Sequence, residues 1–266
     1  MSAPKIRLDS VSKSFGGSVV AVEKLSLDIR DGEFLAIVGP SGCGKTTVLN
    51  MLAGLEPATS GTMTLNGKPI EGPGAERGVM FQDYALFPWR TVRGNVEFGL
   101  VYGPAGHGLS PAERTERVER TIEMVGLKGS QEKYPYELSG GMRQRVALAR
   151  LMASEPEILL MDEPLAALDA QTRVILQDEL LRIWGQDRPA PERRTVVFIT
   201  HAIDEAVFLA DRVAVLSSHP GRLKQIIDID LPRPRGDATR RSGDFARLCQ
   251  SIWELIREEA YRATMN

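Results

Sequence analysis

The sequence predicts an α/β protein whose core is a largely parallel sheet. Short apolar runs, too brief for helices, occur at residues 34–39, 158–163, 196–200 and 213–216. Segments with helical periodicity lie between some of these runs, and a glycine-rich turn directly follows the first. Buried strands that alternate with helices are typical of a parallel sheet covered by helices.

Length and composition set the first limits. A chain of 266 residues buries a substantial core as one large domain or two smaller lobes. Its net charge of −2 disfavours a dedicated nucleic-acid binder. The two cysteines, Cys43 and Cys249, show no metal-ligand spacing, which indicates a reducing compartment. No segment approaches the roughly 20 apolar residues of a membrane span, so we expect a cytoplasmic chain that reaches a membrane only through a partner.

The first third of the chain is predicted to form strands around one helix. Residues 6–29 alternate apolar and polar positions around a Gly16-Gly17 turn, which predicts an antiparallel sheet with a second strand over 19–29. A helix is expected over 46–53, a small hairpin over 62–70 and a buried strand over 78–81.

The middle of the chain differs because helical patterns dominate it. Helices are predicted over 91–101, 111–125 and 142–152, and Ser110 followed by Pro111 is a strong start signal for the second. The proline- and arginine-containing segment 231–241 is the one candidate linker, and a short helical pattern follows it.

An eight-residue glycine-rich motif joins the strand at 34–39 to the next helix. It fits the phosphate-loop pattern G-x-x-x-x-G-K-[ST] in the strand-loop-helix context that the motif requires. Its glycines turn backbone N–H groups toward phosphates, the lysine meets the β and γ oxygens, and the threonine hydroxyl ligates Mg²⁺. The alternative is a chance glycine turn. The motif consists of Gly39, Pro40, Ser41, Gly42, Cys43, Gly44, Lys45 and Thr46.

Two adjacent carboxylates follow the apolar run at 158–161. Asp162 is predicted to hold Mg²⁺ directly or through water, and Glu163 to polarise the attacking water. Alone, such a pair is more often a solvated strand end; the phosphate loop favours the functional interpretation.

A second anion site is predicted before the helix at 142–152. Ser139, Gly140 and Gly141 precede that helix, so Ser139 is a natural N-cap. A helix N-terminus preceded by serine and glycines also binds anions. One nucleotide has no evident need for both sites of one chain.

The segment LSGGMRQR, placed between the phosphate loop and ILLMDEP, resembles the signature of ABC-transporter ATPase subunits. The resemblance covers about residues 6–235. It implies a P-loop NTPase of the ABC ATPase type, with a RecA-like core, an antiparallel β subdomain and a helical signature subdomain over about 86–152. It divides the chain into an ATPase domain, 1–235, and a short C-terminal helical extension, 236–266. In that family two subunits pack head to tail, and each ATP lies between the phosphate loop of one and the signature of the other.

The resemblance also implies roles for four separate residues. Phe15 is expected to stack on adenine, Gln82 to link Mg²⁺ and the attacking water to the membrane subunit, and His201 to contact the γ-phosphate. Asp169 matches the D-loop aspartate, in a loop where Ala166 replaces the serine or glycine of many relatives. Taken singly, these residues also fit strand core, a surface amide, a strand-end histidine and a helix cap. The expected nucleotide-binding set is completed by the phosphate loop, Thr47, Ser139, Gly140 and Gly141.

Within the family, residues 70–100 and 217–235 most resemble the ATPase subunits of taurine, sulfonate and nitrate importers. That resemblance implies ATP and Mg²⁺, a homodimer, a separate membrane permease and a substrate-binding protein, with no nucleic-acid partner. Taurine or another sulfonate is the first expectation and nitrate the second. It also implies that apolar residues within 85–90 receive the permease, where plain core is the simpler interpretation. The rival is a ribosome- or DNA-associated soluble ABC ATPase. A P-loop nucleotide kinase does not account for LSGGMRQR.

Three remaining residues receive no functional role. His107 and His219 lie in glycine- and proline-containing segments, which predicts exposed loop positions. Cys43 is expected to be a small filler within the phosphate loop rather than a reactive thiol.

Overall fold

The computed structural model describes residues 3–189 and 192–265, and the chain divides into two compact units. The first unit comprises the chain up to Gly74 and again from Leu181 onward, and the second unit comprises Ala75–Leu180. Within the described ranges, no helix is both long enough and apolar enough to cross a membrane.

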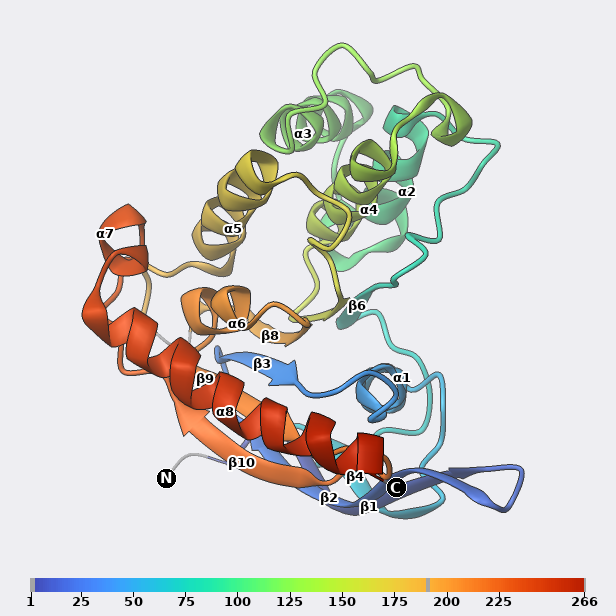
Figure 1. Cartoon of the computed structure of the whole chain (residues 1–266). Coiled ribbons are helices and arrows are strands. Elements are labelled where there is room, and N and C mark those ends of the chain that lie inside the picture. The colour runs from blue at the N-terminus through green and yellow to red at the C-terminus, as the bar shows by residue number, and fades with distance from the viewer. Residues whose placement is uncertain (1–2, 190–191, 266) are drawn as a thin grey trace. The chain divides into compact units, whose positions relative to one another are not determined.

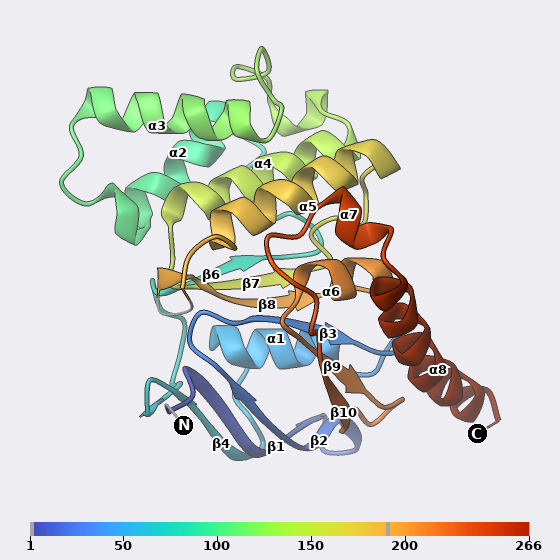
Figure 2. The same ribbon diagram turned by 90° about the vertical axis from the view of Figure 1, so that its left-hand side faces the viewer.

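An antiparallel sheet opens the first unit (Figure 2). Its strand order is β2-β1-β4-β5, and β1 pairs with β2 in a register that sets Ile6 opposite Ile29. Gly16 and Gly17 have φ values of +57° and +74°, the left-handed conformation that a tight turn needs. The strands span Ile6–Phe15 (β1), Val19–Ile29 (β2), Ser60–Leu65 (β4) and Lys68–Pro69 (β5).

The second sheet of this unit contains the continuous apolar runs. β3 (Phe34–Val38) pairs in parallel with both β8 (Thr195–Ile199) and β9 (Arg212–Leu216), and β10 (Leu223–Asp228) pairs antiparallel with β9. Every residue of β3, β8 and β9 is buried, which explains why these strands do not alternate.

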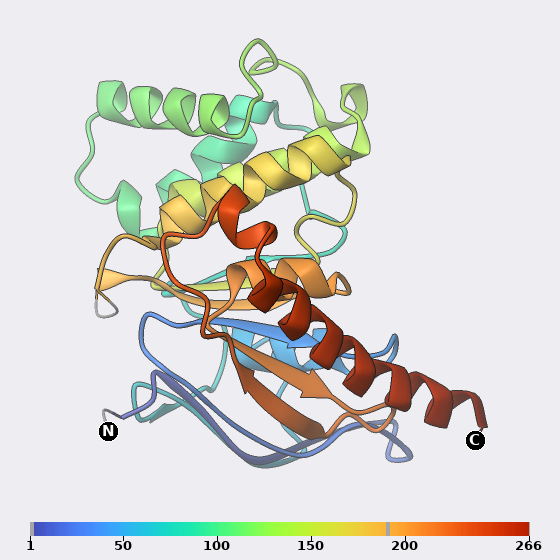
Figure 3. The same ribbon diagram turned by 60° about the vertical axis from the view of Figure 1, so that its left-hand side comes forward.

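Among the described residues, four helices lie entirely within the first unit. They are α1 (Lys45–Ala53), α6 (Ile203–Leu209), α7 (Asp237–Arg240) and α8 (Gly243–Met265). α1 ends at Gly54, whose φ of +76° forms a left-handed cap. α8 packs against α6 and β9, and Figures 1 and 3 show it running beside them.

The second unit is mainly helical. Its parallel strands are β6 (Arg77–Met80) and β7 (Ile158–Asp162), and its helices are α2 (Val92–Tyr102), α3 (Pro111–Met124) and α4 (Gly140–Ser154), with short 3₁₀ turns η1 (Pro104–Gly106) and η2 (Pro135–Glu137). α2 packs against both α3 and α4. α5 (Ala170–Trp184) begins in this unit and continues into the first.

The two expected N-caps, Ser110 and Ser139, are confirmed, and Thr91, which was expected inside its helix, is the N-cap of α2. The Thr91 hydroxyl accepts a hydrogen bond from the Gly94 N–H at 3.2 Å, and Ser110 forms a capping box with Glu113. Ser139 caps α4, which begins at Gly140 rather than at Met142 as predicted.

The interpretation of residues 231–241 as a linker is wrong. Arg235 is only 4% exposed. Its guanidinium donates to five backbone carbonyls, those of Val207, Phe208, Ala210, Ile229 and Leu231. Because the end of α6 leaves carbonyls without helical partners, a buried guanidinium satisfies them and holds this segment on the first unit.

Candidate nucleotide-binding site

The phosphate loop connects β3 to α1 within the first unit. Gly42 and Gly44 have φ values of +75° and +91°, which L side chains rarely adopt. Among the described residues no side chain caps the N-terminus of α1, and its first turn lacks acidic residues. The positive end of the helix therefore faces the loop without a competing carboxylate, which suits bound phosphate.

Lys45 and Thr46 begin α1 with different exposure. Lys45 is 6% exposed, and its Nζ donates to the carbonyls of Gly39 and Pro40, each at 2.9 Å. The ammonium is thereby fixed above the loop. Thr46 and its neighbour Thr47 are exposed and half-buried respectively. A threonine hydroxyl in this position suits Mg²⁺, which prefers oxygen ligands.

Cys43 is fully buried inside the loop, as the filler interpretation predicts. Burial raises the pKa of its thiol, although nearby Lys45 opposes the shift. Because the pKa is raised, a smaller fraction of the Cys43 thiol is ionised to the reactive thiolate at neutral pH.

Phe15 and His201 also belong to the first unit. Phe15 ends β1 and is 40% exposed, so the alternative of plain strand core is wrong for this residue. The Nζ of Lys13 lies 5.0 Å from its ring centroid. His201 follows β8 and is exposed. Next to it, the Thr200 hydroxyl donates to Glu205 at 2.7 Å and accepts from the Ala202 N–H at 3.0 Å, which fixes the turn after the strand.

The two carboxylates lie at the end of β7 in the second unit. Asp162 is 3% exposed, whereas Glu163 is half-buried and has a φ of +49°. The backbone therefore turns sharply at Glu163. The Gln144 amide, in α4, donates to the Glu163 carbonyl at 3.2 Å and supports this conformation.

The N-terminus of α4 presents the serine and glycines of the signature. The Ser139 hydroxyl accepts from the Met142 N–H at 3.3 Å, and Ser139 is exposed. The first turn of α4 has no acidic residue. The Arg143 guanidinium donates a hydrogen bond to the Leu138 carbonyl at 2.7 Å, which holds the residue before Ser139. This arrangement has the chemistry of a second anion site.

Gln82 and Asp169 are exposed in the same unit. Asp169 accepts from the Thr172 N–H at 2.9 Å and from its hydroxyl at 2.7 Å, so it acts as a helix cap. These hydrogen bonds hold the pKa of Asp169 below its ordinary value.

The segment after Gln82 is held by a residue that no sequence pattern indicated. Tyr84 and Ala85 have φ values of +64° and +42°. Arg150, in α4, donates to both carbonyls, at 2.8 Å and 2.6 Å. Arg150 was missed, and Gln144 was quoted within LSGGMRQR without a role, because only tertiary contacts reveal what the two residues do.

Site residues thus fall into two groups, each held by its own unit. The first unit carries the phosphate loop, Phe15 and His201, and the second carries Gln82, the signature, Asp162, Glu163 and Asp169. His107 and His219 are exposed, as predicted for loop residues.

A glycine-rich loop between a parallel strand and a helix, with its lysine and threonine at the helix start, defines a P-loop nucleotide-binding protein. The sequence model of the family described as ABC transporter matches residues 22–166. The chain belongs to the ATP-binding subunits of this family, and it binds ATP and couples its hydrolysis to transport.

Three curated relatives extend the similarity to nearly the whole chain. An uncharacterized ABC transporter ATP-binding protein of Methanocaldococcus jannaschii is 50% identical over 97% of this chain and 94% of its own. The aliphatic sulfonates import ATP-binding protein SsuB of Bacillus licheniformis is 46% identical, with coverages of 90% and 87%. The nitrate import ATP-binding protein NrtD of Synechocystis sp. is 45% identical, with coverages of 91% and 90%.

A solved structure supports the fold. A dimeric ATP-binding cassette in a post-hydrolysis state, bound to ADP and Pi, aligns with a TM-score of 0.75 and 30% identity. The alignment covers 87% of this chain and 99% of that one. The predicted ABC ATPase fold, with its antiparallel β subdomain, is confirmed.

Proposed function

We propose that this chain is the ATPase subunit of an importer for small oxyanions, with sulfonates such as taurine first and nitrate second. It works as a head-to-tail homodimer on the cytoplasmic face of the membrane, attached through a separate permease. A substrate-binding protein supplies the transported anion to that permease.

The observation that carries the head-to-tail dimer is the presence of two anion-type helix N-termini in one chain. α1 and α4 both begin after glycine-containing segments, and neither has an acidic residue in its first turn. Each lies in a different unit. Because one nucleotide needs only one phosphate loop, the N-terminus of α4 serves an ATP held by a second copy, through Ser139 and Gly141.

Each residue of the proposed site has a distinct role in ATP binding or hydrolysis. Lys45 neutralises the β and γ oxygens, Phe15 stacks on adenine, and His201 contacts the γ-phosphate. Glu163 takes the proton of the attacking water, and its half-buried position suits a base that must reach the nucleotide. Thr46, Asp162 and Gln82 are the residues that would hold Mg²⁺, which when bound neutralises charge developing on the phosphates. Asp169 belongs to the D-loop, which contacts the second subunit of the dimer.

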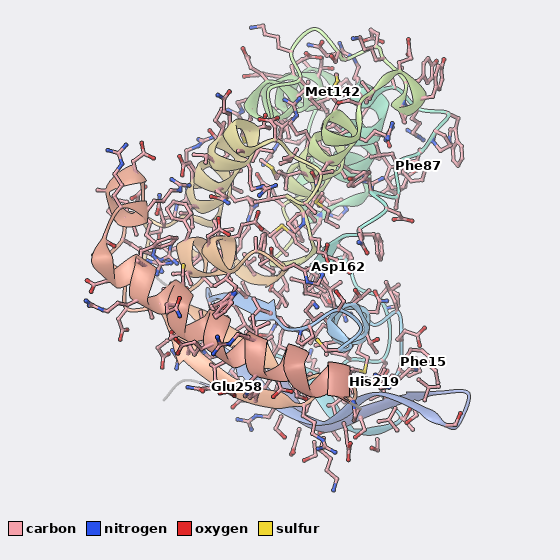
Figure 4. The ribbon with its side chains drawn as sticks, viewed as in Figure 1. Phe15, Phe87, Met142, Asp162, His219 and Glu258 are labelled. Carbon is pink, nitrogen blue, oxygen red and sulfur yellow. The ribbon has the colours of Figure 1, made fainter. Side chains whose placement is uncertain are left out.

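An aromatic surface in the second unit suits the permease contact. Phe87 packs on Trp89 and Phe98, with ring centroids 5.6 Å and 4.5 Å apart, and Phe98 packs on Tyr102 at 4.5 Å. Trp89 is 71% exposed and Tyr102 67% exposed, so this cluster is not plain core (Phe87 is labelled in Figure 4). Phe98 and Tyr102 also line a groove of 220 Å³. Exposed aromatic patches of this kind mark protein interfaces.

The dimer is tested with the Glu163→Gln variant, which is expected to retain bound ATP because the residue acts on water. Light scattering should show a monomer without ATP and a dimer with it. The Ser139→Arg change, made in the same background, should abolish the dimer, since a bulky cation then fills the second anion site. A Glu163→Gln protein that binds ATP and stays monomeric at high concentration would contradict a dimer formed by the ATPase subunits alone.

The transported anion is suggested by the names of two relatives, one for aliphatic sulfonates and one for nitrate. The gene is deleted in the source organism, and growth is compared on taurine as the sole sulfur source and on nitrate as the sole nitrogen source. We expect loss of growth on taurine, restored by the wild-type gene and not by the Glu163→Gln gene. Unchanged growth on both would exclude both substrates.

The soluble ABC ATPase alternative predicts a different partner. Its members act on ribosomes or DNA, so the Glu163→Gln protein with ATP should co-sediment with ribosomes or shift duplex DNA. We expect neither, because the chain has a net charge of −2 and so lacks the excess of basic residues that binds nucleic-acid phosphates.

A further inference from the structure

The turn between β9 and β10, residues 217–222, lies against the phosphate loop. The Gly221 N–H donates to the Ala21 carbonyl at 3.0 Å, and its carbonyl accepts from the Glu23 N–H at 2.9 Å. A Cβ atom on Gly221 would lie 2.0 Å from the Cys43 carbonyl oxygen, far inside van der Waals contact. Only glycine fits here, because the backbone of the turn touches the backbone of the loop.

The phosphate loop meets neighbouring backbone at two further points. A Cβ on Gly44 would lie 2.7 Å from the Ala21 carbonyl oxygen, and one on Gly39 would lie 3.0 Å from that of Leu216. The loop therefore rests on β2 at one point and on the end of β9 at another. Its conformation depends on where these neighbours are held.

A buried carboxylate of α8 holds the turn. Glu259 is 3% exposed, and its Oε2 accepts from the Ser218 N–H at 3.0 Å and from the Ser218 hydroxyl at 3.3 Å. Its Oε1 lies 3.0 Å from the Nζ of Lys224 in β10, which also donates to the Leu255 carbonyl at 3.1 Å. A carboxylate buried this deeply is stable only because it is paired and hydrogen-bonded.

The adjacent residue provides a natural comparison. Glu258 also contacts the Lys224 Nζ, at 2.8 Å, but its side chain is 57% exposed. Figure 4 labels Glu258 on α8 and His219 in the turn that Glu259 holds. Two neighbouring glutamates thus share a lysine, and Glu259 is the one that bonds to Ser218.

We infer that Glu259 is a positioning residue for the phosphate loop, acting through the turn at Ser218–Gly221. By anchoring Ser218, α8 keeps Gly221 against Cys43 and holds the loop in the shape that receives triphosphate. The C-terminal helix is thereby part of the support of the nucleotide site. The inference rests on the proposed use of this loop by ATP.

The test compares Glu259→Ala with its neighbour Glu258→Ala in a Cys249→Ser background. Affinity for a fluorescent ATP analogue, KM and kcat for ATP, and the rate of Cys43 alkylation are measured, and thermal unfolding checks the fold. The Cys249→Ser change leaves Cys43 as the sole cysteine, so the alkylation rate reports on the loop alone.

For Glu259→Ala we expect about tenfold weaker nucleotide binding and a matching rise in KM, with kcat at saturating ATP unchanged. Cys43 alkylation should accelerate about tenfold, because the loop opens more often. Glu258→Ala should match the background protein in all four measurements. Glu259→Gln, which keeps the volume and one acceptor oxygen, should lie between the two.

Gly221→Ala approaches the same contact from the other side. Its methyl group must displace the Cys43 carbonyl, so it should weaken ATP binding and speed alkylation even with Glu259 intact.

Equal nucleotide affinity and equal alkylation in Glu259→Ala and Glu258→Ala would overturn the inference. If Glu259→Ala does not fold, Glu259→Gln and Gly221→Ala decide by the same two measurements. A background protein that binds no ATP would instead remove the proposed function, so the two failures are distinguishable.

Discussion

The side chain of Gln144 reaches from α4 to the end of β7, where its Nε2 donates to the backbone carbonyl of Glu163 at 3.2 Å. Gln144 is 1% exposed, and Glu163 has a φ of +49°. A left-handed glutamate is a strained conformation that persists only when its surroundings enforce it. The bond therefore joins the helix that begins at Ser139 to the proposed catalytic base within one unit.

Replacing Gln144 with leucine should lower the rate of hydrolysis more than the affinity for ATP. The leucine preserves volume but leaves the Glu163 carbonyl without this donor, so the glutamate is less well aligned with water. We expect kcat to fall about tenfold with KM nearly unchanged, in steady-state ATPase assays. Gln131→Leu, which removes a hydrogen bond to Glu119 elsewhere in this unit, is the control and should keep wild-type kcat. An unchanged kcat in Gln144→Leu would show that Glu163 holds its conformation without this bond.

Arg150 should control the order of the segment that follows Gln82. Its two hydrogen bonds hold Tyr84 and Ala85, both left-handed, and burial lowers the pKa of its guanidinium while Asp83 opposes this shift. The Arg150→Met variant loses both bonds and should be destabilised by about 2 kcal/mol. Hydrogen exchange at residues 82–86 should accelerate at least roughly tenfold. Exposed Arg120→Met is the matched control, and similar exchange in both variants would contradict this role.

Much of the fold was predictable because its signals are local. Ser110 followed by Pro111 marks the start of α3 within a few residues of sequence, and Ser139 does so for α4. Apolar runs predicted β3, β7, β8 and β9, since strands buried on both faces must be continuously apolar.

α5, α6 and β10 were not predicted, and the last two have weak local patterns. α6 spans seven residues, of which five are buried, so it shows no amphipathic period. β10 is mostly half-buried, and its two exposed positions lie three residues apart, so it lacks the two-residue alternation that predicts a strand. Arg235 lies in the segment 231–241, whose proline and arginine content is typical of a linker. Only its hydrogen bonds to the distant carbonyls of Val207, Phe208 and Ala210 reveal that it is buried.

Some residues of the candidate site were predictable from sequence motifs, and others were revealed only by the fold. Lys45, Asp162 and Ser139 follow from motifs because phosphate chemistry demands these residue types at these spacings. Arg150 and Glu259 belong to no motif, and Gln144 lies within LSGGMRQR without a role that the motif assigns. Each of the three acts through a backbone carbonyl or N–H brought near by the fold. Support for a site is therefore harder to predict than the site itself.

Loss of the phosphate-loop lysine should give a different failure from loss of the base. Lys45→Ala removes the ammonium that is held over the Gly39 and Pro40 carbonyls, so ATP affinity should fall about a hundredfold, as measured by titration with a fluorescent analogue. Glu163→Gln should bind ATP with near wild-type affinity and lose turnover. Lys68→Ala, an exposed lysine in β5, is the control for charge. Equal affinity in Lys45→Ala and Lys68→Ala would remove Lys45 from the site.

Arg235 should be among the most sensitive positions for stability. Substitution with leucine deprives five buried carbonyls of their donor while filling a similar volume, and unpaired buried acceptors are costly. We expect the free energy of unfolding to fall by about 3 kcal/mol in urea titrations, with an unchanged m-value. Arg241→Leu, at an exposed position six residues later, should change stability by less than about 0.5 kcal/mol. Arg235 holds residues 229–235 against the end of α6, and α7 and α8 follow this segment in the chain. Its loss should therefore loosen the connection between β10 and α7. Proteolysis of Arg235→Leu should begin in residues 231–241, and cleavage that begins elsewhere would contradict this account.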